Sequence, residues 1–497
     1  MADDLYIGID LGTTGIKVGL FNVAGDTIAA ASREIQLDTP APGFAEFDGD
    51  EYIDLAFDGI REALAGPGVD AGTVRAIGLS SQAQTFVLLD EDGRLVRPAV
   101  SWLDVRAGAE AEELSQLSAG VGAEEVNAIS SAPKILWLRR HEPEVMARVR
   151  GVHVIPDHFI YRLTGRAATD PVTASSTGAY EKWEQRWLEE LLAACGLEVG
   201  MMPDVLLPGQ AAGELTAGAA AALGLPRGVV AVVGTNDQYA GALGAGNATP
   251  GCASLALGTA LAIVATSETR EDLPPGEGVA PHPAAGKDGG LYALLTYAKT
   301  SGVVVRWFRD NFAPSLSYDE LFAEADSAPI GADGVSCLPH FSGTATPDFN
   351  PAVRGAFSGL SLAHGRAHLA RALAESLAFT VRENLDLLGR TVQVTDLRAI
   401  GGGAKSDIWL QMIADVTGVP VVRPETREAA CLGAAALGMV GAGRYDSVAG
   451  AVRELYRPGR CFEPDPEVRG AYDEAHARYR RLYESLYGKQ QEETASG

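Results

Sequence analysis

The amino-acid sequence predicts an α/β fold with mixed sheets, on three observations. Short apolar strands alternate with helical stretches along almost the whole chain of 497 residues. An apolar strand runs through a Gly/Thr turn into a second strand at 6–20, and a partial echo follows at 254–264. Between them, 228–234 is a continuous apolar run of strand length, which is typical of a fully buried strand.

Hydrophobic spacing and turn residues predict the individual elements in chain order. The first 36 residues predict a meander of three strands, whose turns are the Gly/Thr loop and Ala24-Gly25-Asp26. Further apolar runs predict strands at 76–80 and 85–90. Amphipathic and alanine-rich stretches predict helices at 51–65, 107–117, 187–195, 216–223, 301–311, 368–388, 408–416, 429–440 and 464–487.

The length and the 46% hydrophobic content suffice for at least two packed domains, because single cores stop growing near about 250 to 300 residues. We place the boundary at the Gly/Pro-rich segment 246–251, which gives an N-terminal domain at 1–247 and a C-terminal domain at 248–488. The polar segment 489–497 is expected to be a disordered tail. The Pro/Gly-rich stretch 267–290 is expected to be a long loop that covers a cleft.

The net charge of −25 argues against nucleic acid and anionic membranes as partners, because both would be repelled. The five cysteines lack CxxC spacing, and an odd number cannot all pair within one chain, so reduced thiols are expected. Together with the eight histidines they show no ligand spacing, which argues against zinc. The N-terminus has no leader pattern, and no stretch offers about 18 uninterrupted apolar residues. We therefore expect a soluble, cytoplasmic protein.

The turn at 11–15 has the residues of a phosphate-binding hairpin. Gly12 and Gly15 permit positive φ angles and close backbone approach, and Thr13 and Thr14 add hydroxyl donors. Lys17 adds a cation nearby, and Asp10 stands at the end of the first strand, where a carboxylate can hold a water-bound Mg²⁺. The alternative is an ordinary hairpin, since Gly, Thr and Asp are common turn residues.

Asp237 is the candidate general base. It follows the buried strand predicted at 228–234 and opens a stretch of small residues that is typical of a helix start. A carboxylate held there can accept the proton of a hydroxyl group. The alternative interpretation is that Asp237 or Asn236 only caps that helix.

Together these residues make the chain resemble the FGGY carbohydrate kinases, and within them the xylulokinases. The resemblance extends from Tyr6 to about Gly443. Ile129 occupies a position usually held by another residue type, and Leu373 and Ala374 depart from the second family signature. The matching motifs are the first phosphate motif at 6–19, the Trp-x-Asp-x-Arg segment at 101–106, the two signatures at 131–141 and 355–375, and the adenosine motif at 401–415.

The resemblance implies two ribonuclease-H-like domains of the actin superfamily, with a cleft between them that closes on sugar and ATP. It implies that Asp237 is the catalytic base and that Asp10 and Asp237 hold Mg²⁺. It also implies that ATP is bound by Thr13, Thr14, Lys17, Gly258, Thr259, Gly302, Gly402, Gly403, Ala404 and Ser406.

The substrate residues that the resemblance implies are Gln82, Ala83, Gln84, Trp102, Asp104, Asp237 and Gln238. Xylulokinases usually show Gln-Met-His-Gly at 82–85, and glycerol kinases Gln-Arg-Glu-Thr, so Ala83 and Gln84 depart from both. A glutamine amide can donate and accept hydrogen bonds with sugar hydroxyls. The implied reaction is the phosphorylation of D-xylulose to D-xylulose 5-phosphate.

Several alternatives remain open. The same scaffold can serve another ketose, a polyol such as glycerol, erythritol or ribitol, or gluconate. A sugar or nucleotide sensor without turnover is a second class, and an actin-like or heat-shock-type ATPase is a third. Asp10, Lys17, Asp237 and Thr259 together argue against the sensor, and Trp102, Asp104 and Asp237 argue against the ATPase. A homodimer is the common habit of the family.

Overall fold

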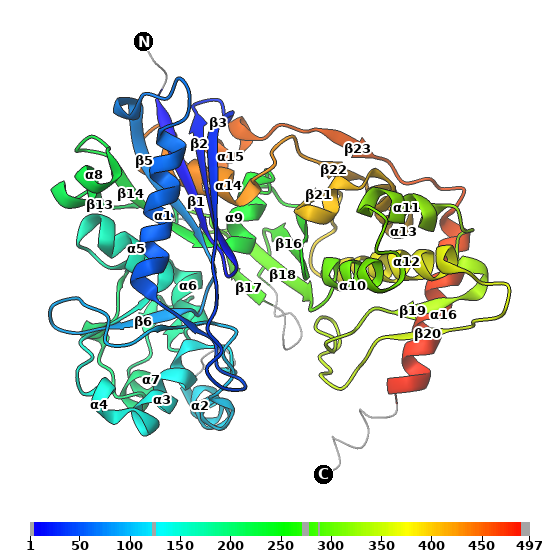
Figure 1. The fold of residues 1–497 in the computed structure, drawn as a ribbon, viewed down its shortest axis with the longest axis horizontal. Coiled ribbons are helices and arrows are strands. Elements are labelled where there is room, and N and C mark those ends of the chain that lie inside the picture. The colour runs from blue at the N-terminus through cyan, green and yellow to red at the C-terminus, as the bar shows by residue number, and fades with distance from the viewer. Residues whose placement is uncertain (1–3, 122–125, 271–277, 287–288, 489–497) are drawn as a thin grey trace. The chain divides into compact units, whose positions relative to one another are not determined.

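The computed structural model describes residues 4–121, 126–270, 278–286 and 289–488. The chain divides into two compact units, which Figure 1 draws as ribbons. The first unit contains 1–248, 280–290 and 428–456, and the second contains 249–279, 291–427 and 457–497. The structure therefore differs from the division into 1–247 and 248–488, because two later segments return to the first unit.

A six-stranded mixed sheet forms the centre of the first unit. Its first three strands are the antiparallel meander that the sequence predicted, and the next two strands run parallel to the first one. The strands lie in the order β13-β14-β5-β1-β2-β3, with bounds Ala211–Glu214, Val230–Asn236, Val74–Ser81, Leu5–Leu11, Gly15–Asn22 and Thr27–Glu34.

Helices cover both faces of this sheet. On one face, α1 (Gly49–Leu64) and α5 (Ile155–Thr164) pack on the side chains of Ile7 and Ile9. On the other face, α14 (Ala429–Gly441) packs among a separate cluster that contains Tyr6. Tyr6 lies in the cluster on one face of the sheet, and its neighbours Leu5 and Ile7 lie in the cluster on the other face, because successive side chains of a strand point to opposite faces.

The first unit also carries a smaller sheet with its own apolar core around Phe86 and Leu138. Its strand order is β4-β7-β6-β8, with bounds Glu46–Phe47, Ala99–Val100, Phe86–Leu89 and Gly151–Val154. The helices α2, α3, α4 and α7 accompany it, with bounds Gly108–Val121, Ser131–His141, Pro143–Met146 and Glu189–Ala194.

A seven-stranded mixed sheet forms the centre of the second unit. Its order is β17-β18-β16-β15-β21-β22-β23, with bounds Gly278–Pro281, Tyr292–Ala298, Leu261–Ser267, Cys252–Leu257, Asp396–Ile400, Val421–Arg423 and Arg460–Phe462. Along β18-β16-β15-β21-β22, the first two pairings are antiparallel and the next two are parallel. The strands β3-β2-β1-β5-β14 of the first unit show the same pattern. The echo between the two hairpins therefore reflects two halves of the same topology.

The helices of the second unit include α10 (Gly302–Phe312), α12 (Arg366–Leu388) and α13 (Asp407–Thr417), close to their predicted positions. The sequence did not predict α11 (Tyr318–Asp326). The last helix, α16, begins at Arg469 rather than at Pro464 and ends at Tyr487. The expected tail at 489–497 lies outside the described residues.

The prediction of a long loop at 267–290 is wrong for the described part of that stretch. The strand β17 lies there, and its backbone joins the seven-stranded sheet. Residues 271–277 and 287–288 of that stretch lie outside the described residues. The remaining helices are α6 (Pro171–Ser176), α8 (Ala217–Leu223), α9 (Asp237–Gly244) and α15 (Val448–Leu455). The remaining short strands are Ala168–Thr169, Tyr180–Glu181, Arg186–Trp187, Asp204–Val205, Ser336–Leu338 and Ala356–Ser358.

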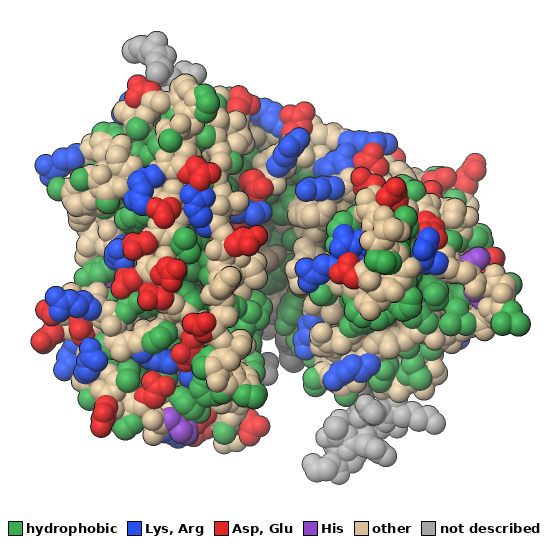
Figure 2. All heavy atoms as spheres, in the orientation of Figure 1, with side chains coloured by type: hydrophobic (Ala, Val, Ile, Leu, Met, Phe, Trp, Pro, Cys, Tyr) green, Lys and Arg blue, Asp and Glu red, His purple; other side chains and the backbone are tan. Residues whose placement is uncertain are grey.

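Acidic and basic side chains are interspersed over the first unit on the face drawn in Figure 2. Exposed pairs include Arg162 with Asp50, at 2.6 Å, and Arg33 with Glu62, at 2.5 Å. Such pairs contribute little stability one by one because water and salt screen them. In the part of the chain that the structure describes, no helix is both long and apolar enough to cross a membrane.

Candidate active site

Two carboxyl groups meet at one edge of the six-stranded sheet. Asp10 is the last residue but one of β1, and Asp237 follows directly after β14 as the first residue of α9. Because β1, β5 and β14 are mutually parallel, their carboxyl ends lie at the same edge. The Ser80 hydroxyl at the end of β5 donates a hydrogen bond of 2.7 Å to Oδ1 of Asp10.

The surrounding protein changes the protonation of both carboxyl groups. The pKa of Asp237 is raised to about 7, mainly by removal from water and in addition by the nearby negative charge of Asp10, while hydrogen bonding with Gln238 opposes the rise. Removal from water also raises the pKa of Asp10, although the Ser80 hydroxyl opposes this. A carboxyl group whose pKa lies near neutral pH is matched to accepting and releasing a proton.

The helix cap at this position is Asn236 rather than Asp237. The side-chain oxygen of Asn236 accepts a hydrogen bond of 3.0 Å from the backbone amide of Gln238. Asp237 is therefore not needed as a cap, and as a residue it is only partly buried. This geometry weakens the capping interpretation of Asp237 and supports its role as a base.

The pair also fits a divalent cation. The negative charge of Asp10 raises the pKa of Asp237, so the two neighbouring carboxyl groups form a site of negative potential, and oxygen is the ligand that Mg²⁺ prefers. Among the described residues no group of three or more His, Cys, Asp or Glu side chains is placed to hold a metal ion. Mg²⁺ usually keeps several waters and binds through one or two carboxylates, so two suffice.

The hairpin between β1 and β2 is closed by the amide of Gly12, which donates to the carbonyl of Gly15 at 3.1 Å. The expectation of positive φ angles at these glycines is wrong, because neither has one. Both are needed for close approach instead. A Cβ on Gly12 would lie 2.7 Å from the Gly15 oxygen, and one on Gly15 would lie 2.9 Å from the Arg33 oxygen.

Lys17, the cation that the sequence places near the hairpin, is paired in the structure. Its ammonium group donates to the Glu428 carboxylate at 2.8 Å, and both side chains are partly exposed. Burial alone would lower the pKa of Lys17, but the hydrogen bond and charge of Glu428 outweigh it, and the pKa is raised. Sequence reasoning missed Glu428 because it lies 411 residues away in the chain.

Gln82 is buried and its amide group is used within the protein. It donates to the Gly12 carbonyl at 3.2 Å and to the Tyr52 hydroxyl at 3.3 Å, and it accepts from Thr85 at 2.9 Å. Ala83 is buried as well. Gln82 therefore supports the phosphate hairpin, and the partly exposed Gln84 is the residue of this segment that can reach a substrate.

Trp102 and Asp104 differ in their accessibility. Trp102 is partly exposed, and its indole donates to the Thr13 hydroxyl at 2.8 Å. Asp104 is fully buried, where it accepts a hydrogen bond of 2.7 Å from the Ala45 amide and forms an ion pair of 2.6 Å with Arg106. Each Asp104 oxygen thus accepts a hydrogen bond from a protein group, and the expectation that Asp104 lines the sugar pocket stays a prediction.

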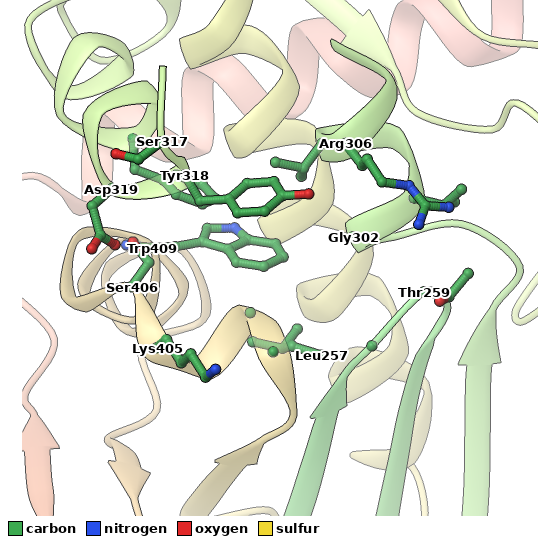
Figure 3. A pocket seen from close by; sticks show the side chains of 16 residues that line it. Leu257, Thr259, Gly302, Arg306, Ser317, Tyr318, Asp319, Lys405, Ser406 and Trp409 are labelled. Atoms are coloured by element: carbon green, nitrogen blue, oxygen red, sulfur yellow. Dashed lines mark hydrogen bonds between the residues drawn. The ribbon is translucent and has the colours of Figure 1, made fainter. Parts of the chain in front are cut away.

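The second unit contains a cavity of about 550 Å³, which Figure 3 shows from close by. Six of the expected ATP residues line it, whereas Ala404 is buried and does not. Those six are Gly258, Thr259, Gly302, Gly402, Gly403 and Ser406. Arg306 and Tyr318 also line it, and sequence reasoning did not single them out.

Aromatic rings form one wall of this cavity. Trp409 stacks on Phe322 with ring centres 5.2 Å apart and planes 20° apart. In Figure 3 the Tyr318 ring lies beside the Trp409 indole, with Ser406 near one end and Arg306 and Thr259 near the other. Flat apolar walls of this kind suit a planar heterocycle.

Glycines keep the other end of the cavity open. The Gly302 amide donates to the Gly258 carbonyl at 3.0 Å, and a Cβ on Gly302 would lie 2.6 Å from that oxygen. A Cβ on Gly403 would lie 2.4 Å from the Trp409 ring. Arg306 adds a positive charge to the lining of this cavity.

Comparisons with known proteins agree over nearly the whole chain. Residues 5–244 match the N-terminal domain of the FGGY family of carbohydrate kinases, and 253–442 match its C-terminal domain. The xylulose kinase of Escherichia coli K12 is 32% identical over 490 residues, which cover 97% of this chain and 99% of that protein. The autoinducer-2 kinase of Enterobacter sp. strain 638 is 30% identical over 513 residues, with 97% and 94% covered. The crystal structure of xylulose kinase from Rhodospirillum rubrum superposes with a TM-score of 0.88 at 31% identity, with 97% and 99% covered.

Proposed function

Since the chain belongs to the FGGY family of carbohydrate kinases, we propose that it phosphorylates D-xylulose to D-xylulose 5-phosphate with ATP as the donor. The observation that carries the mechanism is Asp237 at the sheet edge, a partly exposed residue whose carboxyl pKa of about 7 suits a general base. Two relatives named xylulose kinase, both at least 31% identical to this chain, support the choice of sugar.

In the proposed reaction the ionised Asp237 accepts the proton of the substrate hydroxyl. The hydroxyl oxygen forms a bond to the γ-phosphorus of ATP while the bond from that phosphorus to the β-γ bridging oxygen breaks, and ADP leaves. Asp10 and Asp237 would hold Mg²⁺, which neutralises phosphate charge when bound. Hydrogen bonding with Gln238 favours the ionised form of the Asp237 carboxyl group, because it lowers the pKa of that group.

The nucleotide residues follow from the cavity and the hairpin. We assign the adenine to the slot beside Tyr318 and Trp409, where Gly402 and Gly403 leave room for a flat base. We assign the phosphates to Gly258, Thr259 and Gly302, with Arg306 as an additional cation. In the first unit, Thr13, Thr14 and Lys17 are assigned to the phosphates as well.

The substrate residues are Gln84, Trp102, Asp237 and Gln238 in this proposal. The departure at Ala83 and Gln84 favours a second candidate, in which the acceptor is another ketose, a polyol or gluconate. A glutamine amide can pair with any of these hydroxyl patterns, so it selects a polyhydroxylated substrate without selecting one sugar. A cytoplasmic location and a homodimer also remain predictions.

The test is ADP release with Mg·ATP across D-xylulose, D-ribulose, L-xylulose, L-ribulose, glycerol, erythritol, ribitol and gluconate. A strong preference for D-xylulose would support the proposal, and a preference for another compound would replace the sugar while retaining the kinase. ATP binding without ADP release on any of them would contradict the proposal and favour the sensor.

The substitution Asp237→Ala tests the base directly. We expect turnover to fall by about 10² to 10⁴, the usual contribution of a general base, while ATP binding measured by calorimetry stays nearly unchanged. Asp92→Ala is the matched control, because Asp92 is an exposed turn residue whose carboxylate pairs with Arg94 at the surface. Equal turnover of Asp237→Ala and the wild-type protein would refute the assignment.

A further inference from the structure

Lys134 is a buried cation that the proposed reaction does not use. It lies in the first turn of α3, its side chain is fully buried, and its ammonium group donates to three backbone carbonyls. The three carbonyls belong to Ser101 at 3.0 Å, Trp102 at 3.2 Å and Ile129 at 2.9 Å. An ammonium group has three protons, so this set of partners uses all of them.

The charge of Lys134 is costly at this position. Burial lowers its pKa to about 7, with Asp104 opposing this effect and Arg106 adding to it. Lysines are almost never fully buried unless they are paired, and here the partners are backbone oxygens rather than a carboxylate. Such a contact fixes the course of the main chain at the three carbonyls.

Two of those carbonyls, of Ser101 and Trp102, belong to the segment that carries the Trp102 indole. The Trp102 amide donates to the Thr85 hydroxyl at 3.0 Å, and its indole donates to the Thr13 hydroxyl at 2.8 Å. Lys134 holds the remaining polar group of this residue, its carbonyl. These contacts fix the main chain of Trp102, and the indole hydrogen bond then holds its ring against the phosphate hairpin.

The same turn of α3 also holds Gln84. The Ser131 hydroxyl donates to the Gln84 carbonyl at 2.8 Å. Gln84 has a φ of 61°, a left-handed conformation that costs a non-glycine residue energy and persists only where neighbours hold it. Ser131 and Lys134 thus restrain the two partly exposed residues that face a sugar in the proposed function.

We propose that Lys134 is a positioning residue for the substrate, which together with Ser131 clamps the segments of Trp102 and Gln84 and so sets the affinity for the sugar. The inference rests on the proposed function, because it needs Trp102 and Gln84 to contact the substrate. It assigns Lys134 no contact with the reacting atoms. A residue that acts in this way changes the KM for the sugar more than the KM for ATP.

The test is the substitution Lys134→Met, which keeps the length of the side chain and removes its donors. With D-xylulose as the varied substrate, we expect the sugar KM to rise about tenfold or more, since hydrogen bonds to a charged group are lost from the clamp. The KM for ATP should stay within about twofold. Arg139→Met is the matched control, because Arg139 lies on the same helix and donates to the carbonyls of Ala193 and Ala194, away from this segment.

A second variant keeps the inference falsifiable if Lys134→Met does not fold. Ser131→Ala removes only the hydroxyl that holds the Gln84 carbonyl, and it should also raise the sugar KM. A wild-type protein that phosphorylates no sugar would contradict the proposed function. A different result would overturn the clamp but leave the proposed function intact. In that case the wild-type protein is active, and the folded Lys134→Met and Ser131→Ala variants keep the wild-type sugar KM while only their unfolding temperature falls.

Discussion

Asp237 shows at the scale of a residue how the surroundings of a carboxyl group change its chemistry. Its ordinary pKa would leave it a weak base at neutral pH, but removal from water and the charge of Asp10 raise the pKa to about 7. The effect of Asp10 depends on the parallel arrangement of β1, β5 and β14, which brings the two strand ends together. The reactivity of Asp237 is therefore a property of the sheet edge.

We predict that kcat/KM for the sugar falls as the pH drops below about 7, because protonated Asp237 cannot accept a proton. The measurement is the pH dependence of ADP release at constant ionic strength. In Asp10→Asn the residual activity should show its acid limb at lower pH, since losing a neighbouring negative charge lowers the pKa of Asp237. An acid limb that stays in place or moves to higher pH would contradict this account, and Asp92→Asn serves as the control.

Other polar residues near this edge show the limit of sequence reasoning about single side chains. Gln82 and Asp104 have the positions and chemistry of sugar ligands in the sequence, yet their polar atoms are bound to Gly12, Tyr52, Ala45 and Arg106. Some of these partners are distant in sequence. Their proximity arises only when the strands and loops assemble.

At the scale of an element, α14 shows how glycines allow a helix to lie close on a sheet. Positions 8 and 78 on neighbouring strands face the helix backbone, and a Cβ on either would lie 1.9 Å from a carbonyl oxygen of α14. Gly433 of α14 approaches α9 in the same way, with a would-be Cβ 2.0 Å from the Ala240 oxygen. These contacts fix α9, which begins with Asp237.

We predict that Gly8→Ala lowers the free energy of unfolding by about 2 kcal/mol or more, because backbone atoms of β1 and α14 would have to separate. Gly218→Ala is the matched control. Gly218 lies on α8, where a Cβ would meet no atom within 4 Å, and alanine there should stabilise the helix by up to about 1 kcal/mol. Denaturant unfolding of both variants checks this, and equal midpoints would contradict it.

At the scale of the whole molecule, the first unit is assembled from segments that are far apart in the sequence. The apolar cluster on one face of its sheet contains Tyr6, Phe21 and Val232 from the first half of the chain, and Leu437 and Val452 from the later segment. The covering helices α14 and α15 both lie within 428–456. The first unit is therefore incomplete without residues that follow the second unit in the chain.

We predict that a fragment of residues 1–248 exposes this apolar face and aggregates, whereas the same fragment joined through a flexible linker to 428–456 stays monomeric. The physical reason is the loss of the helix that covers β1 and β5. Size-exclusion chromatography and binding of a hydrophobic dye compare the two fragments. A stable monomer of 1–248 alone, with no dye binding, would show that this face needs no cover.

Much of the fold was determined by the sequence itself. The meander at the start of the chain, the buried strand before Asp237 and most helices follow from local hydrophobic period and turn residues, which act over a few positions. The motifs that identify the family are short runs of residues that can be read without the fold, so the kinase family could be inferred from residues alone.

Only the tertiary structure decided which residues meet. It paired Lys17 with Glu428, enclosed Asp104 beside Arg106, placed β17 in the second sheet and returned α14 to the first unit. It also set the pKa of Asp237, because burial and the distance to another charge are defined only in the folded chain. Local pattern specifies the elements, whereas long-range packing and the exclusion of water specify their contacts and their chemistry.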